Sequence, residues 1–204
     1  MVFANQLPSS ARAAAPFSKT LLCFGDSLTA GYGLESPATD AFPALLQEKF
    51  DALSPSVPRW RVSNAGLSGE TTAGGARRID WILRQPVDIF ILALGANDGL
   101  RGIAPAVSLK NLQTIIDRVR DRYPAAKIIL AGMMMPPILG QDYVREFAAI
   151  YPALAAENHL TLMPFLLQGV GGLSKFNQSD GIHPSPAGHA IIADNVWAVV
   201  KPLL

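Results

Sequence analysis

Four short segments carry the side chains that are best suited to chemistry. They are Gly25-Asp26-Ser27-Leu28, the glycine-containing stretch around Gly69, Gly95-Ala96-Asn97-Asp98, and Asp180-Gly181-Ile182-His183. A serine hydroxyl is a weak nucleophile at neutral pH and needs a base beside it. A histidine that is held in place by a carboxylate can act as that base. These residue types therefore favour acyl transfer through a serine, provided that the fold brings the segments together.

Three histidines are candidates for the base. His183 lies in a loop rich in Gly and Pro, and Asp180 precedes it by three residues, so this carboxylate can hold the ring tautomer from the same turn. His189 falls within the last expected helix and His159 comes before the last expected strand. We expect structural roles for these two, and the sequence predicts His183 as the base for Ser27.

Apolar segments and amphipathic segments alternate along the chain. Continuous runs of Leu, Ile and Val are typical of parallel strands buried on both faces. They predict five strands, at residues 20–24, 60–63, 87–94, 127–131 and 160–163. Apolar residues spaced three and four apart predict helices over 109–123 and 143–154, and Pro152 should kink the second helix or open a shorter one. Ser185 and Pro186 predict the N-cap and first turn of a last helix.

Right-handed crossovers between these strands produce a doubly wound α/β fold. Five strands favour a flavodoxin-like, three-layer α/β/α arrangement whose parallel sheet has the order 2-1-3-4-5. Ligands bind such folds outside the carboxyl ends of the strands, near the point where the strand order reverses. The loops after strands one, two and three are therefore the expected site.

Each of those loops contains a residue with a possible role. Ser27 follows strand one, Gly69 follows strand two and Asn97 follows strand three. A backbone N–H at Gly69 and the amide of Asn97 can then face the same point as Ser27, as a tetrahedral oxyanion requires. The connection 164–179 is long enough to bring His183 back to this point, since an extended chain spans ~3.3 Å per residue.

The composition argues against several kinds of partner. The chain has 17 Lys and Arg against 16 Asp and Glu, without blocks of charge, which gives no reason to expect a nucleic acid or an anionic membrane as partner. No apolar stretch approaches the ~18 residues of a membrane span. Cys23 lies in an apolar run and is expected to be buried. Metal-ligand spacing around His183 and phosphate-binding glycine motifs are both missing, so we expect neither a metal nor a cofactor.

We expect a single domain at residues 20–204 and a separate segment at residues 1–19. This segment is rich in Ala, Ser and Pro, and Ala11-Arg12-Ala13 resembles a signal-peptide cleavage site. No apolar region precedes that tripeptide. Residues 1–19 are therefore either a disordered tail or the remnant of a trimmed signal peptide.

The four segments resemble the sequence blocks of SGNH/GDSL hydrolases, in the same order, and the resemblance covers residues 20–204. Three further stretches resemble the bacterial branch of thioesterases, lysophospholipases and arylesterases: Gly31-Tyr32-Gly33, residues 65–71 and residues 97–102. The resemblance implies an SGNH hydrolase fold and a protein that is periplasmic or secreted.

The same resemblance implies a role for each motif residue. Ser27 is the implied nucleophile, His183 the general base and acid, and Asp180 the carboxylate that orients the histidine. The implied oxyanion hole consists of the Ser27 N–H, the Gly69 N–H and the side-chain amide of Asn97.

Other motif residues have lesser expected roles. Asp26 and Asp98 are expected to organise their loops. The stretch 133–140, Met-Met-Met-Pro-Pro-Ile-Leu-Gly, is more apolar than this branch leads us to expect. Met134 and Leu139 are candidates for the wall of an acyl pocket, because flexible side chains adapt to varied acyl groups. Simple packing at the end of strand four is the alternative.

The predicted function is hydrolysis of small acyl, aryl or lipid esters, and of acyl thioesters, by two-step acyl transfer without a cofactor. Two alternatives remain at this point. The same blocks occur in carbohydrate O-acetylesterases, which a panel containing acetylated sugars would distinguish. A flavodoxin-like module without catalysis would instead bind a flavin or a phosphate. The sequence makes no prediction of oligomeric state.

Overall fold

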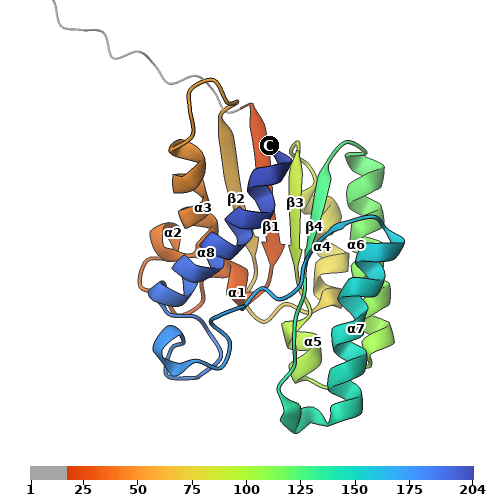
Figure 1. The fold of residues 1–204 in the computed structure, drawn as a ribbon. Helices are drawn as coiled ribbons and strands as arrows, with labels where there is room; N and C mark the ends of the chain where they lie inside the picture. Colours follow the sequence, from red (N-terminus) through yellow and green to blue (C-terminus); the bar gives the residue numbers. More distant parts are fainter. Residues whose placement is uncertain (1–17) are drawn as a thin grey trace, which may run out of the picture.

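The computed structural model describes residues 18–204, which form a sheet of five parallel strands in the order β2-β1-β3-β4-β5 (Figure 1). The strands are β1 (Lys19–Gly25), β2 (Trp60–Gly66), β3 (Ile89–Ala93), β4 (Lys127–Ala131) and β5 (Thr161–Met163). The order and the parallel pairing confirm the predicted flavodoxin-like sheet. Each predicted strand overlaps an observed strand.

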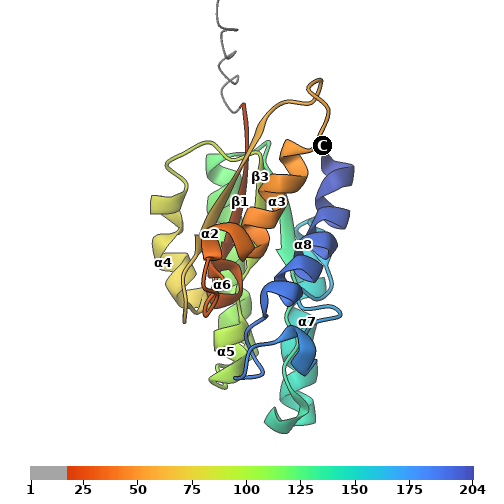
Figure 2. The same ribbon diagram turned by 90° about the vertical axis from the view of Figure 1, so that its left-hand side faces the viewer.

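Helices cover both faces of the sheet. They are α1 (Ser27–Ala30), α2 (Pro37–Asp40), α3 (Phe42–Asp51), α4 (Thr72–Ile82), α5 (Ala96–Leu100), α6 (Pro105–Arg122), α7 (Gln141–Glu157) and α8 (Pro186–Val200), with short 3₁₀ turns η1 (Pro137–Leu139), η2 (Ser174–Phe176) and η3 (Lys201–Leu203). α3 packs against α8 on one face (Figure 2). α4 packs against α6 on the other face, and α7 packs against α6. The layers confirm the three-layer α/β/α prediction.

The central strands are buried because helices cover them from both sides. All five residues of β3 are buried, as are the five residues of β1 from Leu21 to Gly25. Removing such apolar side chains from water stabilises the fold by roughly 1.5–3 kcal/mol each. Cys23 is fully buried, as expected, and burial raises the pKa of its thiol.

The carboxyl ends of β2, β1 and β3 are level with one another. Gly25 pairs with Gly66 on one side and with Ala93 on the other. A Cβ at Gly66 would lie 2.2 Å from the Ala30 nitrogen, so the missing side chain lets α1 pack directly against the strand end. The three loops that carry Ser27, Gly69 and Asn97 therefore start side by side at one edge of the sheet.

The sequence made one prediction about the start of α8 and one about Pro152 in α7. The N-cap of α8 is confirmed, because Ser185 Oγ accepts a hydrogen bond from the Gly188 N–H and Pro186 is the first helical residue. α7 contains Pro152 in its interior, so no separate shorter helix opens there. His159 follows α7 with a positive φ of 48° and is exposed.

Residues 1–17 lie outside the described part of the chain, so the expectation for the segment 1–19 stays a prediction; Lys19 already belongs to β1. Between residues 18 and 204, none of the helices combines the length and apolarity that a bilayer span requires.

Candidate active site

Ser27 is the first residue of α1, and only Asp26 separates it from the end of β1. Asp26 is the N-cap of that short helix, and its Oδ1 accepts a hydrogen bond from the Leu28 N–H at 3.0 Å. The Asp26 side chain is fully buried, and its Oδ2 has no hydrogen-bond partner among the described residues. Burial, with smaller contributions from the charges of Glu70 and Asp98, raises the pKa of Asp26 to about 7. Asp26 thus organises the turn that presents Ser27, in keeping with its expected role.

His183 reaches Ser27 across the sheet edge. Its Nε2 lies 3.0 Å from Ser27 Oγ, and its Nδ1 lies 2.6 Å from Asp180 Oδ2. The other Asp180 oxygen accepts hydrogen bonds from the backbone N–H groups of Ile182 at 2.9 Å and His183 at 3.0 Å. Asp180 and His183, which were expected to pair within one turn, are therefore in contact. The long connection after β5 brings both residues to Ser27.

The charge of Asp180 fixes the tautomer of the neutral His183 ring. The hydrogen bond from the His183 ring is the main reason why the pKa of Asp180 falls to about 2, and the two backbone N–H groups add to it. An ionised carboxylate can only accept hydrogen bonds, so Nδ1 carries the ring proton. Nε2 is then free to accept the proton of the Ser27 hydroxyl.

Gln178 and Tyr32 hold the histidine loop in place, and no local sequence signal indicates either contact. Gln178 Nε2 donates to the Tyr32 carbonyl at 2.7 Å and to the Pro184 carbonyl at 3.0 Å. The Tyr32 ring lies 4.7 Å from the His183 ring, centroid to centroid. The loop that carries the histidine is thereby attached to the loop after α1.

Gly69 lies in the loop after β2 and Asn97 in the short helix α5 after β3, and the two segments are neighbours, as predicted. The Asn97 Nδ2 donates to the Glu70 carbonyl at 3.0 Å, which joins α5 to the loop after β2. Gly69 has a φ of +78°, a left-handed conformation that favours glycine. A pocket of about 500 Å³ opens beside this loop, and its lining includes Gly69 and Arg101.

Asp98 organises its loop, again in keeping with the expectation. It is fully buried and accepts hydrogen bonds from the Thr72 N–H at 2.8 Å, the Thr72 Oγ1 at 2.5 Å and the Ser108 Oγ at 3.1 Å. These contacts attach α5 to the start of α4.

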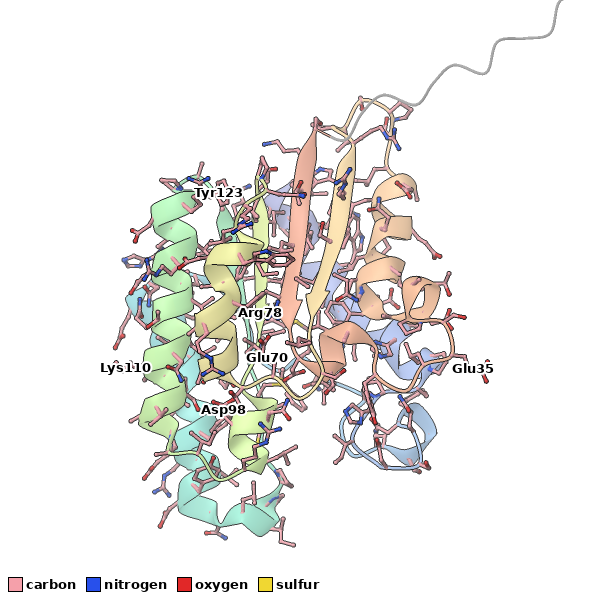
Figure 3. All side chains as sticks on the ribbon, turned by 180° about the vertical axis from the view of Figure 1, so that it is seen from behind. Glu35, Glu70, Arg78, Asp98, Lys110 and Tyr123 are labelled. Atoms are coloured by element: carbon pink, nitrogen blue, oxygen red, sulfur yellow. The ribbon has the colours of Figure 1, made fainter. Side chains whose placement is uncertain are left out.

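The buried Glu70 forms an ion pair with the half-buried Arg78, and Figure 3 shows both residues near Asp98. Arg78 Nε lies 2.6 and 2.8 Å from the two carboxylate oxygens. Arg78 Nη2 also donates to the carbonyls of Gly25 at 3.3 Å and Ala65 at 2.8 Å. One guanidinium therefore connects the ends of β1 and β2 to Glu70. Sequence reasoning missed it, because Glu70 lies in a recognised stretch but nothing in the sequence marks Arg78 as its partner.

The stretch 133–140 follows β4 and divides between core and surface. Met133 and Met135 are buried, whereas Met134 is 52% exposed. Leu139 is half-buried and packs against the core. The two candidate pocket residues therefore differ, since Met134 is open to solvent and Leu139 also contributes to packing.

His189, the third histidine, is fully buried in α8. Its Nδ1 accepts a hydrogen bond from the Phe42 N–H at 3.2 Å, and burial lowers the pKa of its ring to about 4. This confirms the structural role expected for it. Among residues 18–204, no group of three His, Cys, Asp or Glu side chains is arranged to hold a metal ion.

The chain is similar in sequence and in structure to known hydrolases. Residues 23–191 match the model of the GDSL-like Lipase/Acylhydrolase family. The chain is 40% identical over 188 residues to Esterase TesA of Pseudomonas aeruginosa, covering 92% of this chain and 90% of that protein. It is 37% identical over 194 residues to Thioesterase 1/protease 1/lysophospholipase L1 of Escherichia coli K12, covering 95% and 88%. A crystal structure of TesA has a TM-score of 0.83 at 40% identity, covering 91% of this chain and 100% of that one.

The sheet, the helical layers and these relatives define an α/β ester hydrolase of the SGNH type. The chain belongs to the GDSL-like lipase/acylhydrolase family, and it is a carboxylic ester hydrolase. A flavodoxin-like binding module without catalysis is therefore set aside.

Proposed function

We propose that this enzyme hydrolyses carboxylic esters and acyl thioesters through a triad of Ser27, His183 and Asp180. The observation that carries the proposal is the continuous chain of hydrogen bonds, 3.0 Å from Ser27 Oγ to His183 Nε2 and 2.6 Å from His183 Nδ1 to Asp180 Oδ2. A nucleophile, its base and the group that orients the base are then all in contact.

The reaction has two acyl-transfer steps. Ser27 Oγ attacks the acyl carbon while His183 Nε2 takes the hydroxyl proton. The bond to the leaving alcohol or thiol then breaks, and His183 gives its proton to that group. Water repeats the attack on the acyl-enzyme, again with His183 as base, and releases the acid. Asp180 stabilises the imidazolium that forms in each step, and the cycle uses no cofactor.

Three donors form the proposed oxyanion hole. The Ser27 N–H is at the first position of α1, where a backbone N–H has no partner within the helix. The Gly69 N–H comes from the loop after β2. The Asn97 amide has two N–H hydrogens, and the Glu70 carbonyl accepts only one of them. Such donors stabilise the charge on the tetrahedral intermediate.

The stretch after β4 is the proposed wall of the acyl pocket. Met134 is half-exposed, and Leu139 lies in the turn η1 that follows it. A flexible thioether adapts its shape to acyl groups of different length. Met134 is therefore the residue that we expect to influence chain-length preference most directly, with Leu139 behind it.

The substrate class follows from the relatives' names and from this mechanism. One relative is named an esterase and the other a thioesterase and lysophospholipase. We therefore propose small acyl, aryl and lipid esters together with acyl thioesters as substrates.

We also propose that the protein is periplasmic or secreted. Fractionation of the cells that produce it would test this location, and recovery with cytoplasmic markers would contradict it.

The test is hydrolysis of p-nitrophenyl esters from acetate to palmitate and of an acyl thioester, with an acetylated sugar in the same panel. Ser27→Ala should abolish turnover of every substrate. Ser56→Ala, which changes an exposed serine in the loop before β2, is the matched control and should keep the wild-type rate. Turnover that survives in Ser27→Ala would reassign the nucleophile. Activity on the acetylated sugar alone would favour a carbohydrate O-acetylesterase instead.

A further inference from the structure

Three side chains of α5 and its C-cap contact the loop after β2 and the start of α4. Asn97 donates to the Glu70 carbonyl at 3.0 Å, and Asp98 accepts from Thr72. Arg101, the C-cap residue of α5, donates from Nη2 to the Gly69 carbonyl at 3.2 Å. Asp98 is buried in the interior, whereas Arg101 makes its contact from the exposed surface. The loop is therefore fixed both from inside and from outside.

Arg101 contacts two of the three segments that supply the proposed oxyanion hole. Its Nη2 lies 3.2 Å from the Gly69 carbonyl and 3.4 Å from Asn97 Oδ1. Asn97 and Arg101 are four residues apart, so they lie on the same side of the helical turn, and the guanidinium bridges from there to Gly69. One cation thus spans two segments whose relative position determines where an oxyanion can bind.

The contact with Asn97 Oδ1 fixes the orientation of the Asn97 amide. Arg101 occupies the oxygen, and the Glu70 carbonyl occupies one N–H of Nδ2. If the amide turned over, its oxygen would face the Glu70 carbonyl and its NH₂ group would face the guanidinium, so both contacts would become repulsive. The second N–H of Nδ2 is thereby kept available for an oxyanion.

The contact with Gly69 restrains a permissive backbone. Gly69 is exposed, and its positive φ of 78° is a conformation that a glycine can readily leave. Among residues 18–204, Arg101 Nη2 is the single atom within 4 Å of the position of a Cβ at Gly69, at 3.9 Å, leaving aside the chain neighbours of Gly69. Two contacts therefore restrain the Gly69–Glu70 peptide: the Glu70 N–H donates to the Leu67 carbonyl at 3.1 Å within the loop, and Arg101 holds the Gly69 carbonyl from outside it.

We propose that Arg101 is a positioning residue for the oxyanion hole, acting through Gly69 and Asn97. This inference rests on the proposed function, because it assigns a role within the same site. Arg101 acts from the solvent side, and the pair of Glu70 and Arg78 holds the same loop from the interior. A positioning role predicts slower chemistry with little change in substrate binding.

The experiment compares Arg101→Met and Arg101→Lys with the wild type on p-nitrophenyl butyrate. Methionine keeps the bulk but has no donor, so kcat should fall about tenfold, less than the 10²–10³ for outright loss of one oxyanion donor. KM should stay within about twofold, and the pH profile should be unchanged, because His183 and Asp180 are not altered. Lysine keeps a charged donor and should restore kcat to within about threefold of the wild type.

Arg118→Met is the matched control, since Arg118 is an exposed arginine of α6 whose nearest carboxylate contact is 3.9 Å. It should leave kcat, KM and the melting temperature unchanged. A wild-type kcat in Arg101→Met would overturn the inference, and so would a loss of kcat that Arg101→Lys does not restore. If the wild type is active and Ser27→Ala is inactive, either result refutes only the role of Arg101. An inactive wild type would instead refute the proposed function.

Discussion

At the scale of the residue, Asp180 is an ionised carboxylate that stays partly exposed to solvent. Its side chain is 40% exposed, and the hydrogen bond from His183 with two backbone N–H groups lowers its pKa to about 2. A carboxylate with that pKa is ionised throughout the range in which the protein is expected to work. Loss of activity in mild acid should therefore not come from protonation of Asp180.

Replacing Asp180 by asparagine tests this role. Asp180→Asn would place a neutral amide beside Nδ1 and would no longer favour the tautomer with the proton on Nδ1, so kcat should fall by about 10³–10⁴. KM should change little, because the side chain is not proposed to touch the substrate. Steady-state kinetics with p-nitrophenyl butyrate would measure both.

The matched control is Asp142→Asn, which removes an exposed carboxylate at the start of α7. It should keep the wild-type kcat. If Asp180→Asn retained more than about a tenth of the wild-type kcat, another group would have to orient His183.

At the scale of the element, the histidine loop and α8 form one unit. His183 comes three residues before the first residue of α8, and Ser185 caps that helix by accepting from the Gly188 N–H at 3.3 Å. α8 then packs against α3. The start of α8 therefore fixes where the loop can end.

Removing the cap of α8 should destabilise the protein. Ser185→Ala leaves the Gly188 N–H without its partner, which typically costs about 1 kcal/mol. For a chain of this size the melting temperature should fall by roughly 2–4 °C. Thermal unfolding of Ser36→Ala provides the comparison, because Ser36 is the N-cap residue of α2 but makes no capping hydrogen bond. Equal shifts in the two variants would show that the capping bond contributes nothing.

The stretch after β4 should determine acyl chain-length preference. Met134→Ala shortens a half-exposed side chain at the proposed pocket wall, so the optimum among p-nitrophenyl esters should move by about two carbons or more. Leu139→Ala should shift the optimum as well but also lower the melting temperature, because Leu139 packs against the core. An unchanged chain-length profile in both variants would leave strand-end packing as the role of this stretch.

At the scale of the whole molecule, the parts that were predictable from sequence are those with a local or periodic signal. Strand β3 was predictable because burial on both faces demands a continuous apolar run. Asp180 and His183 were predictable because their pairing needs only three residues of separation. The contact from Gln178 to Tyr32 spans 146 positions, and that from Arg101 to Gly69 spans 32. Such contacts depend on how loops fold over one another, for which a sequence has no period or spacing.

Acid stability is a property of the whole fold that His189 should influence. Burial lowers the pKa of His189 to about 4, more than the charge of Asp40 raises it, and the nearby His183 lowers it further. An unfolded histidine titrates near ~6.5, so above that pH the ring is neutral in both states and has no effect. Between ~6.5 and 4 only the unfolded chain binds the proton, so stability falls as the pH falls.

His189→Asn should remove this dependence, because the Asn oxygen can accept the Phe42 N–H but does not titrate. Between about pH 7.5 and 5, the wild type should lose about 2 kcal/mol more unfolding free energy than His189→Asn. Asp26 changes the stability with pH in the opposite sense. Its pKa is raised in the folded protein, so the stability that it contributes is lost as the pH rises from 3.8 to about 7. Asp26 is present in both proteins, so its contribution cancels in the comparison. The control is His159→Asn, at an exposed position with positive φ. Its unfolding free energy, measured by denaturant titration at each pH, should change with pH as that of the wild type does. If the unfolding free energy of His189→Asn also changed with pH as that of the wild type does, the prediction would be contradicted. The buried ring would then have to be protonated in the folded state without cost, which its position in the core opposes.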